Sequence, residues 1–277
     1  MAPLQYRQTG PTDAEPVIFL HAGSYSGTMW IDIASRLTGL RCLIPDLPGH
    51  GGSQHQTLTS LEQAADSVAE LIRATCGERP VTIVGLSFGG YVGLMLLARH
   101  PRLVRRAMLS GIHIGAIPKP QMMKLMAALM SPLIRLAWFR RKMAAPLGVT
   151  DPDIYSRADG SANVSAQTFR RVIGLVLMFD VYSLLPEIDV PTLIVAGENE
   201  HETILRALTE YQERMPNCVA RIVPKMGHAW CNQDPDLFAG TVTSWVHDTL
   251  LPDPLRMPEN QMLDQHSLHS KPTPEDP

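Results

Sequence analysis

Short apolar runs recur along the chain, and amphipathic stretches or glycine-rich loops separate them. The main runs lie at residues 17–20, 42–45, 81–84, 107–109, 192–196 and 220–223. They are mostly continuous rather than alternating, which is typical of strands covered on both faces of a parallel sheet. A weaker alternation at residues 4–9 predicts an edge strand.

Helical patterns fill the intervals between these runs. Thr59-Ser60-Leu61-Glu62 has the spacing of a capping box and opens an amphipathic stretch that ends near Gly77. Further helices are expected at residues 29–37, 90–98 and about 236–250. Strands that alternate with helices predict an α/β fold, with a mostly parallel sheet covered by helices on both faces.

The alternation is interrupted between Ile112 and Pro186. Methionines and one tryptophan lie in helix-like segments there, and prolines break these segments. The residues concerned are Met122, Met123, Met126, Met130, Trp138, Pro118, Pro120, Pro132 and Pro146. We expect residues 112–186 to form a helical cap over the C-terminal edge of the sheet, where open α/β sheets bind ligands. Residues 1–111 and 187–251 then form the core.

The composition changes again after Leu251. Prolines punctuate a polar tail with little apolar content, from residue 252 to residue 277. Such a segment buries too little apolar surface to fold, so we expect this C-terminal tail to be disordered.

The run at residues 81–84 leads directly into Gly85-Leu86-Ser87-Phe88-Gly89. A G-x-S-x-G sequence between a short strand and a helix is the context of a nucleophile elbow. The glycines fit this role, because the tight turn strains the backbone of its serine and leaves no room for bulky neighbours. The alternative is a glycine-rich turn with a bystander serine, and the flanking strand and helix favour the elbow.

A serine hydroxyl needs a base, because its alkoxide is too unstable at neutral pH. Of the ten histidines, His228 in Met226-Gly227-His228-Ala229-Trp230 follows the last apolar run, where its side chain can reach back over the sheet edge. The alternative is a surface-loop histidine. His21 directly follows a buried strand and is expected to hydrogen-bond loop backbone, while His50 and His113 are weaker candidates.

The histidine in turn needs a carboxylate that fixes its tautomer and stabilises the imidazolium. The run at 192–196 ends in Gly197-Glu198-Asn199-Glu200-His201-Glu202, so three glutamates compete. Glu200 lies where the loop is expected to turn over the site, and it is the leading candidate. Glu198 follows the glycine closely, and Glu202 suits the first turn of the next helix. Both remain open.

Two further groups of residues complete the predicted site. Acyl transfer needs two donors aimed at the developing oxyanion, and the backbone N–H groups of Gly23 and Phe88 are the candidates. The candidate substrate-binding residues are Ser24, Trp30, Met126 and Trp230. We expect no metal ion and no organic cofactor.

Composition and charge exclude several classes of protein. The length of 277 residues, 45% of them hydrophobic, suits one α/β domain. A net charge of −3 suggests neither a nucleic acid nor a membrane as partner. The four cysteines are scattered and are expected to be free thiols in a reducing compartment. Without a signal-peptide pattern or a membrane-spanning apolar run, we expect a cytoplasmic protein, as a monomer or homodimer.

The cap contains one basic cluster. It consists of Arg135, Arg140, Arg141 and Lys142. We expect a solvated helix face there, and binding of a substrate carboxylate is the alternative.

Together these features resemble the α/β-hydrolase superfamily over roughly residues 4–251. The resemblance is carried by the segment from His21-Ala22-Gly23 to Trp30, the loop Asp46-Leu47-Pro48-Gly49-His50-Gly51-Gly52-Ser53, the Ser87 elbow, the Gly197 loop and the Gly227-His228 turn. It implies the chain order of nucleophile Ser87, acid Glu200 and base His228. These motifs in this order are specific for the fold and say little about the substrate.

Two positions depart from the family's usual pattern. His-Gly is replaced by His21-Ala22, which leaves one glycine fewer in the oxyanion loop. The acid, usually an aspartate, is a glutamate here, and its longer side chain requires a slightly different loop. The family's other position for the acid follows the strand ending near residues 110–113, which carries no carboxylate. This absence favours the loop at 198–202.

The resemblance implies a serine hydrolase that cleaves a carboxylic ester, or a thioester or lactone, through an acyl-enzyme on Ser87. The expected substrate is a small apolar ester-like molecule. The cap methionines suit an apolar pocket because methionine adapts its shape, although packing of the cap against the sheet explains them equally well.

Two other functions remain open. One is a C–C bond hydrolase or a lyase-type synthase of the same superfamily, which is disfavoured because Tyr91 stands where such a synthase site needs an arginine. The other is a slow-turnover ligand-binding protein with the same fold. Turnover per bound ligand separates this last possibility from an enzyme.

Overall fold

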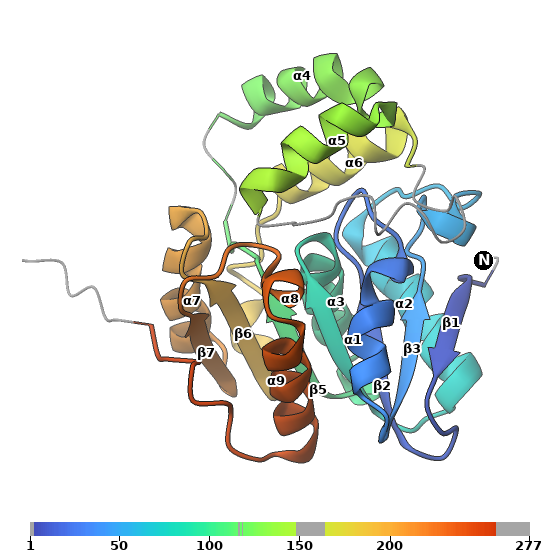
Figure 1. The fold of residues 1–277 in the computed structure, drawn as a ribbon, viewed down its shortest axis with the longest axis vertical. Coiled ribbons are helices and arrows are strands. Elements are labelled where there is room, and N and C mark those ends of the chain that lie inside the picture. Colours follow the sequence, from blue (N-terminus) through green and yellow to red (C-terminus); the bar gives the residue numbers. More distant parts are fainter. Residues whose placement is uncertain (1–2, 116, 118, 148–163, 259–277) are drawn as a thin grey trace, which may run out of the picture.

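The structure is a computed structural model that describes residues 3–115, 117, 119–147 and 164–258. Within these residues seven strands form one sheet in the order β1-β3-β2-β4-β5-β6-β7 (Figure 1). The strands are β1 Tyr6–Thr9, β2 Glu15–Leu20, β3 Leu40–Pro45, β4 Val81–Leu86, β5 Val104–Ser110, β6 Thr192–Gly197 and β7 Cys218–Val223. Only β1 runs antiparallel, on β3 at the sheet edge, and the other pairings are parallel. The predicted edge strand and mostly parallel sheet are confirmed.

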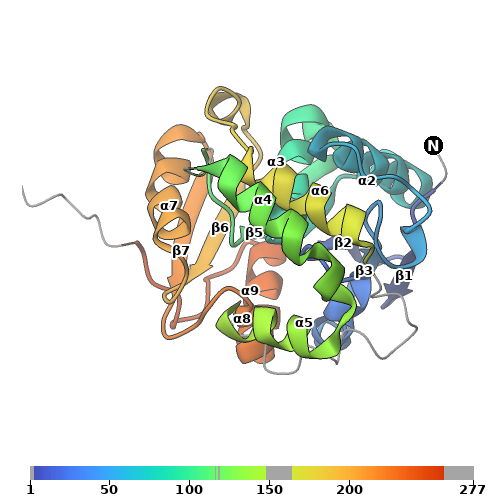
Figure 2. The same cartoon turned by 90° about the horizontal axis from the view of Figure 1, so that it is seen from above.

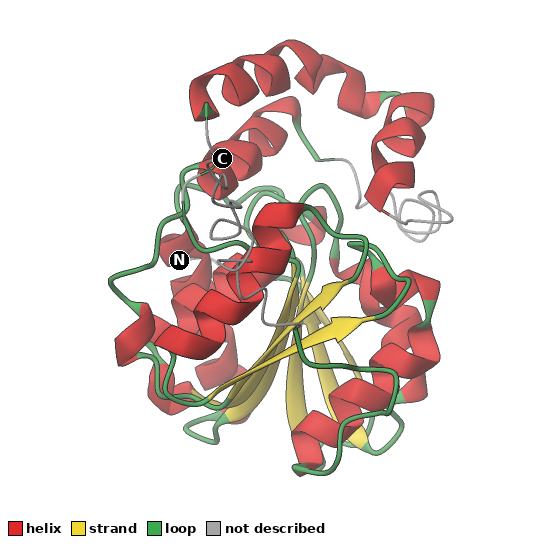
Figure 3. Ribbon diagram, turned by 90° about the vertical axis from the view of Figure 1, so that its left-hand side faces the viewer, coloured by secondary structure: helices red, strands yellow, loops and turns green. Residues whose placement is uncertain are grey.

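Helices cover both faces of this sheet (Figures 1 and 3). The α-helices are α1 Ile31–Arg36, α2 Leu61–Cys76, α3 Phe88–Arg99, α4 Pro120–Met130, α5 Ala137–Ala144, α6 Ala166–Leu177, α7 Glu202–Arg214, α8 Trp230–Gln233 and α9 Pro235–His247. Short 3₁₀ turns are η1 Gly27–Trp30, η2 Gly51–Ser53, η3 Pro101–Leu103, η4 Ser131–Arg135, η5 Ala145–Leu147 and η6 Leu185–Glu187. The single helix expected at residues 29–37 is therefore divided between η1 and α1.

The continuous apolar runs are explained by burial on both faces. In β2, Ile18 and Leu20 pack with α2 and α3 on one face, whereas Val17 and Phe19 pack with α1 and α9 on the other. All four side chains are fully buried. A strand with a hydrophobic core on each side has no polar face, so its apolar run is continuous, as the sequence predicted.

The start of α2 differs from the predicted capping box by one residue. Ser60 is the N-cap, and its hydroxyl accepts a hydrogen bond from the N–H of Gln63. The Gln63 side chain reaches back to the N–H of Thr59 rather than to that of the cap residue. The helix ends at Gly77 as expected, with a φ of 63° that favours glycine.

The segment between β5 and β6 carries α4, α5 and α6, and these helices lie above the C-terminal ends of the strands (Figures 1 and 3). Helix α6 reaches the loops that follow β2 and β3, because a Cβ on Gly23 would lie 2.6 Å from Val172 and one on Gly49 would lie 2.9 Å from Thr168. Pro120 begins α4 instead of breaking a helix, as the first turn of a helix tolerates proline. We call the helices α4–α6 and their connections the cap.

The C-terminal segment departs from the expectation of disorder at its start. Leu255 is buried against the core, and the backbone of Arg256 pairs with that of Ile222. Residues 252–258 therefore belong to the folded body, because one leucine and one backbone bridge anchor them. The remaining part of the predicted tail, residues 259–277, lies outside the described residues.

All four cysteines are free in the structure, and burial raises the pKa of Cys42 to about 11 and those of Cys218 and Cys231 to about 12. In the described part of the chain, no helix combines the length and the apolarity that a membrane span requires.

Candidate active site

Ser87 lies at the turn between β4 and α3. Its backbone has φ 53° and ψ −119°, a conformation that non-glycine residues rarely adopt. The Ser87 N–H donates to the carbonyl oxygen of Ser110 (2.8 Å), and the N–H of Tyr91 donates to the carbonyl oxygen of Ser87 (3.0 Å). These two bonds hold the strained residue between β5 and the first turn of α3. The strain expected for a nucleophile elbow is present.

The glycines on either side make this turn sterically possible. A Cβ on Gly85 would lie 2.6 Å from the carbonyl oxygen of Gly89, and a Cβ on Gly89 would lie 2.1 Å from that of Leu20. Both partners are backbone atoms, so neither collision can be relieved by a side-chain rotation. The spacing of these glycines follows from the close approach of the start of α3 to both β4 and β2.

His228 and Glu200 form a close pair over the same edge of the sheet. Nδ1 of His228 lies 2.9 Å from both carboxylate oxygens of Glu200. The Glu200 side chain is 3% exposed and the His228 side chain 15%. The pair rests on Gly111, where a Cβ would lie 2.6 Å from the His228 ring and 3.2 Å from the carboxylate. Any larger residue after β5 would displace it.

The two loops that carry this pair are fastened to each other. The N–H of Glu198 donates to the carbonyl oxygen of Val223, and the N–H of Asn199 donates to that of Met226 (2.8 Å). A Cβ on Gly197 would lie 2.4 Å from the Met226 carbonyl oxygen, so this crossing requires glycine. The loop after β6 therefore fixes the loop after β7.

The other two glutamates of the loop are engaged elsewhere. The Glu198 carboxylate accepts a hydrogen bond from the N–H of Lys225 and pairs with Arg256. Glu202 lies in the first turn of α7 and pairs with Arg206 one turn later. Among the three candidates, Glu200 is the one that reaches His228.

A short path of contacts joins Ser87 to this pair. Leu86 pairs with Ser110 in the sheet, and Ser110 accepts the N–H of Ser87. The next residue, Gly111, is the one on which His228 rests. The Ser110 hydroxyl also accepts a hydrogen bond from Nε1 of Trp230 (2.8 Å), which ties the loop of His228 to β5. The end of β5, at Ser110 and Gly111, thus supports both the turn of Ser87 and the pair of His228 and Glu200.

The predicted oxyanion loop lies beside the elbow. A Cβ on Gly23 would lie 3.4 Å from Cβ of Phe88, and Phe88 is the first residue of α3. Its N–H is one of the N-terminal donors that have no partner within the helix. Ser24 has a φ of 68°, so the loop turns sharply directly after Gly23.

Two buried histidines support this region without reaching Glu200. The N–H of Leu47 donates to Nε2 of His21 (2.9 Å), and Nδ1–H of His21 donates to the carbonyl oxygen of Ala22 (2.9 Å). The expected backbone role of His21 is confirmed. His50 packs between His21 and Phe88, with ring centroids 4.9 Å and 5.7 Å away. Burial lowers the pKa of His21 to about 4 and that of His50 to about 3.

The structure corrects three of the candidate substrate-binding residues. Trp30 and Trp230 are fully buried, and both rings pack on Phe238 in the core beneath α9. Large apolar residues mark a core and a pocket equally well in a sequence, and these two belong to the core. Met126 points to solvent on α4 and is exposed.

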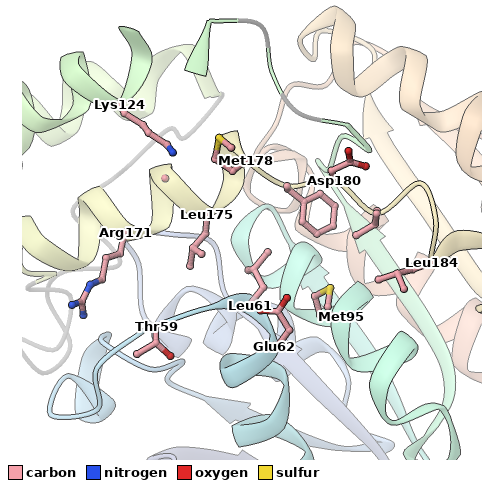
Figure 4. Close-up of a pocket in the computed structure, with 13 residues that line it drawn as sticks. Thr59, Leu61, Glu62, Met95, Lys124, Arg171, Leu175, Met178, Asp180 and Leu184 are labelled. Atoms are coloured by element: carbon pink, nitrogen blue, oxygen red, sulfur yellow. The ribbon is translucent and has the colours of Figure 1, made fainter. Parts of the chain in front are cut away.

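A cavity of about 480 Å³ opens between the cap and the core helices α2 and α3 (Figure 4). Its floor is apolar, and its rim carries two cations, Lys124 and Arg171, and two carboxylates, Glu62 and Asp180. Ser87, Glu200 and His228 are not among its described lining residues. Because the charges on the rim balance, they select no ligand class.

Sequence reasoning did not identify the residues of α6 that approach the predicted oxyanion loop. Val172 lies over Gly23, and Thr168 lies over Gly49. Both are buried. Their positions depend on how the cap folds back on the core, and the sequence offered no local signal for that contact. Within the described residues, no three His, Cys, Asp or Glu side chains gather at a possible metal site.

Comparisons with a family profile and with known proteins point to the same family. Residues 17–241 match the sequence profile of the alpha/beta hydrolase family. The chain is similar to an sn-1-specific diacylglycerol lipase from Mus musculus, with 26% identity over 88% of this chain and 85% of the lipase. It is also similar to a pimeloyl-acyl-carrier-protein methyl ester esterase from Neisseria meningitidis serogroup A, with 25% identity over 89% and 81% of the two chains.

Among solved structures, an esterase from Exiguobacterium antarcticum has a similar fold. The TM-score is 0.77 at 18% identity, over 88% of this chain and 95% of the esterase. At this level of identity the likeness concerns the fold alone.

Proposed function

Since the chain belongs to the alpha/beta hydrolase family and is a hydrolase enzyme, we propose that it cleaves carboxylic esters through an acyl-enzyme on Ser87. The observation that carries the proposal is the part-buried pair of Glu200 and His228, at 2.9 Å, which rests on Gly111 directly after Ser110, the residue that binds the N–H of a serine held at φ 53°. A base oriented by a carboxylate next to a strained serine is the arrangement that activates a hydroxyl nucleophile.

The hydrogen bond to Glu200 sets the tautomer of His228. When Nδ1–H donates to the carboxylate, Nε2 carries the lone pair and acts as the base. Glu200 also stabilises the imidazolium that forms when Nε2 takes up a proton. A low exposure of the carboxylate strengthens this interaction, because little water screens it.

The reaction proceeds in two halves. Ser87 Oγ attacks the ester carbonyl carbon while its proton passes to Nε2 of His228, and the N–H groups of Gly23 and Phe88 bind the oxyanion. His228 then donates this proton to the leaving alkoxide, so that an alcohol departs and Ser87 is acylated. A water molecule attacks the acyl carbon as His228 takes its proton. Return of the proton to Ser87 Oγ releases the carboxylic acid.

The class of substrate follows from the relatives as well as from the site. Their names specify a diacylglycerol lipase and a methyl ester esterase, both of which act on carboxylic esters. The apolar side chain of Val172 lies against Gly23 of the predicted oxyanion loop, which favours an apolar acyl group. We expect a small apolar ester and no metal ion or cofactor in the reaction.

Hydrolysis of p-nitrophenyl esters of short and medium acyl chains tests the proposal. We expect steady turnover by the wild type and a loss of about 10³-fold or more in kcat for Ser87→Ala and for His228→Ala. Ser53→Ala, a serine in the nearby loop of η2, serves as a control for general disturbance. Equal activity of Ser87→Ala and the wild type would contradict the proposal.

A further inference from the structure

The outer side of the cap exposes an unusual number of large apolar side chains. Met122, Leu125, Met126 and Leu129 follow one another at helical spacing along α4, and all four are exposed. Leu125 is 61% and Leu129 is 67% exposed. The opposite side of α4 packs on α6 and η4, where Ala127 and Met130 join a small core. Helix α4 therefore has apolar residues on two sides. One side packs within the cap, and the other is exposed to solvent.

Helix α5 continues this surface with a different composition. Trp138, Arg141 and Lys142 share one face of α5 by their spacing, and all three are exposed, whereas Phe139 is buried in the cap. Figure 2 looks down on the cap and shows α4 and α5 with no other labelled element over them. We call Met122, Leu125, Met126, Leu129, Trp138, Arg141 and Lys142 the outer cap face.

The cap segment is basic overall, because residues 112–186 contain nine lysines or arginines and four aspartates. Between Glu78 and Asp151 the sequence contains no aspartate or glutamate, whereas Lys119, Lys124, Arg135, Arg140, Arg141 and Lys142 lie in the cap segment. The net charge of −3 for the whole chain thus conceals a basic cap on an acidic remainder. An apolar stripe with a tryptophan and flanking cations is the composition of helices that lie in a membrane interface.

We propose that the outer cap face docks the protein onto the surface of an anionic lipid bilayer. The apolar side chains of α4 enter the interface, Trp138 lies at the level of the headgroups, and Arg141 and Lys142 meet lipid phosphates. A second copy of the chain fits this face less well, because two basic caps placed together repel each other. Docking would turn the C-terminal edge of the sheet, with Ser87, toward the lipid.

The four tryptophans provide a direct reporter of docking. Trp138 is 57% exposed, whereas Trp30, Trp230 and Trp245 are buried. A blue shift of intrinsic fluorescence on addition of vesicles therefore reports the transfer of Trp138 into a less polar environment. We expect this shift with vesicles of phosphatidylcholine and phosphatidylglycerol, and we expect 0.5 M KCl to weaken it because salt screens the cations. Trp138→Phe should abolish the shift while the protein still co-sediments with these vesicles.

Variants of the apolar stripe separate docking from catalysis. In the double variant Leu125→Gln/Leu129→Gln, we expect co-sedimentation with the mixed vesicles to fall about tenfold or more, because two apolar anchors are lost. Hydrolysis of a soluble short-chain p-nitrophenyl ester should stay within about twofold of the wild type, since both residues face solvent. Leu250→Gln is the matched control, because Leu250 is 95% exposed beyond the end of α9, away from the cap.

Three results would overturn the proposal. The first is equal binding to vesicles with and without phosphatidylglycerol. The second is unchanged vesicle binding by the double variant. The third is a wild-type dimer in light scattering that the double variant converts to a monomer, without vesicle binding by either, which would assign the face to a second copy. None of these depends on the identity of the catalytic residues, so failure of the proposed function is recognised separately.

Discussion

Glu200 reaches His228 with both carboxylate oxygens, although two further glutamates lie within two residues of it along the chain. The difference lies in what each neighbour already binds. Glu198 holds Lys225 and Arg256, and Glu202 holds Arg206 in α7. The longer side chain of glutamate is accommodated because Gly111 leaves space under the pair.

This geometry predicts how the three glutamates respond to substitution. Glu200→Gln should lower kcat for p-nitrophenyl esters by roughly 10³-fold or more, because the amide no longer stabilises the imidazolium of His228. Glu202→Gln, the matched exposed control, should remain within about twofold. Glu200→Asp should recover part of the activity, since it keeps the charge but shortens the reach. A strong loss in Glu202→Gln with an active Glu200→Gln would reverse the assignment.

The buried histidines predict a dependence of stability on pH. Burial lowers the pKa of His21 to about 4 and that of His50 to about 3, whereas the unfolded chain binds these protons near pH 6.5. Below pH 6.5 the unfolded state therefore holds more protons than the folded state, and the free energy of unfolding falls as the pH falls. The slope reaches at most about 1.4 kcal/mol per pH unit for each histidine.

Urea unfolding between pH 6.5 and 5 measures this effect, because most carboxylates stay charged in that window. His50→Gln should make the free energy of unfolding less dependent on pH, while His55→Gln, at an exposed position, should leave the slope unchanged. A wild type whose stability is constant across this window would show that these histidines are not buried in the neutral form.

At the scale of elements, α6 is the part of the cap that approaches the predicted catalytic loops. Val172 lies over Gly23 and Phe88, so its side chain limits the space beside the predicted oxyanion donors. Val172→Ala should raise the ratio of kcat/KM for medium-chain esters over that for short-chain esters several-fold. Val164→Ala removes the same atoms from the small core of the cap and should leave this ratio unchanged. An equal ratio in both variants would exclude Val172 from acyl selection.

The sequence was most informative where local chemistry determines the element. The apolar runs predicted the strands because β2 and its neighbours are buried on both faces, and G-x-S-x-G predicted the strained turn because only glycine fits at residues 85 and 89. The N-terminus of α2 lies one residue later than predicted, because Thr59 and Ser60 both suit the N-cap position and only the backbone geometry distinguishes them.

The sequence was least informative about contacts made across elements. The sequence around Trp30 and Trp230 does not indicate whether these side chains line a pocket or pack in the core. It also does not indicate which side of α4 Met126 occupies. The approach of Val172 to Gly23 joins residues about 150 positions apart through the folding of the cap. Local patterns cannot specify such contacts.

At the scale of the whole molecule, the end of the chain contributes to the folded body. Leu255 is buried on the core, and Arg256 joins both β7 and Glu198. A chain that ends after residue 258 should keep the stability of the full chain. A chain that ends after Asp253 should lose about 2 kcal/mol or more of unfolding free energy, because a buried leucine and a backbone bridge are removed. Urea unfolding of the two truncated chains compares their free energies of unfolding. Equal values would show that residues 254–258 do not stabilise the fold.

The uneven distribution of charge along the chain predicts how the molecule is oriented at a charged surface. The cap helices lie above the C-terminal ends of the strands (Figure 1), and Ser87 directly follows the C-terminal end of β4. The cap segment carries net positive charge and the rest of the chain net negative charge. An anionic surface would therefore attract the molecule with the cap foremost. The same asymmetry makes a symmetric contact between two caps unfavourable.

The most direct test of the central claim is covalent labelling of the intact chain with a fluorophosphonate, followed by peptide mapping. We expect one label for each chain, located on Ser87, with much slower labelling of Glu200→Gln and His228→Ala than of the wild type. The absence of a label in the active, folded wild type, or a label on another residue, would contradict it.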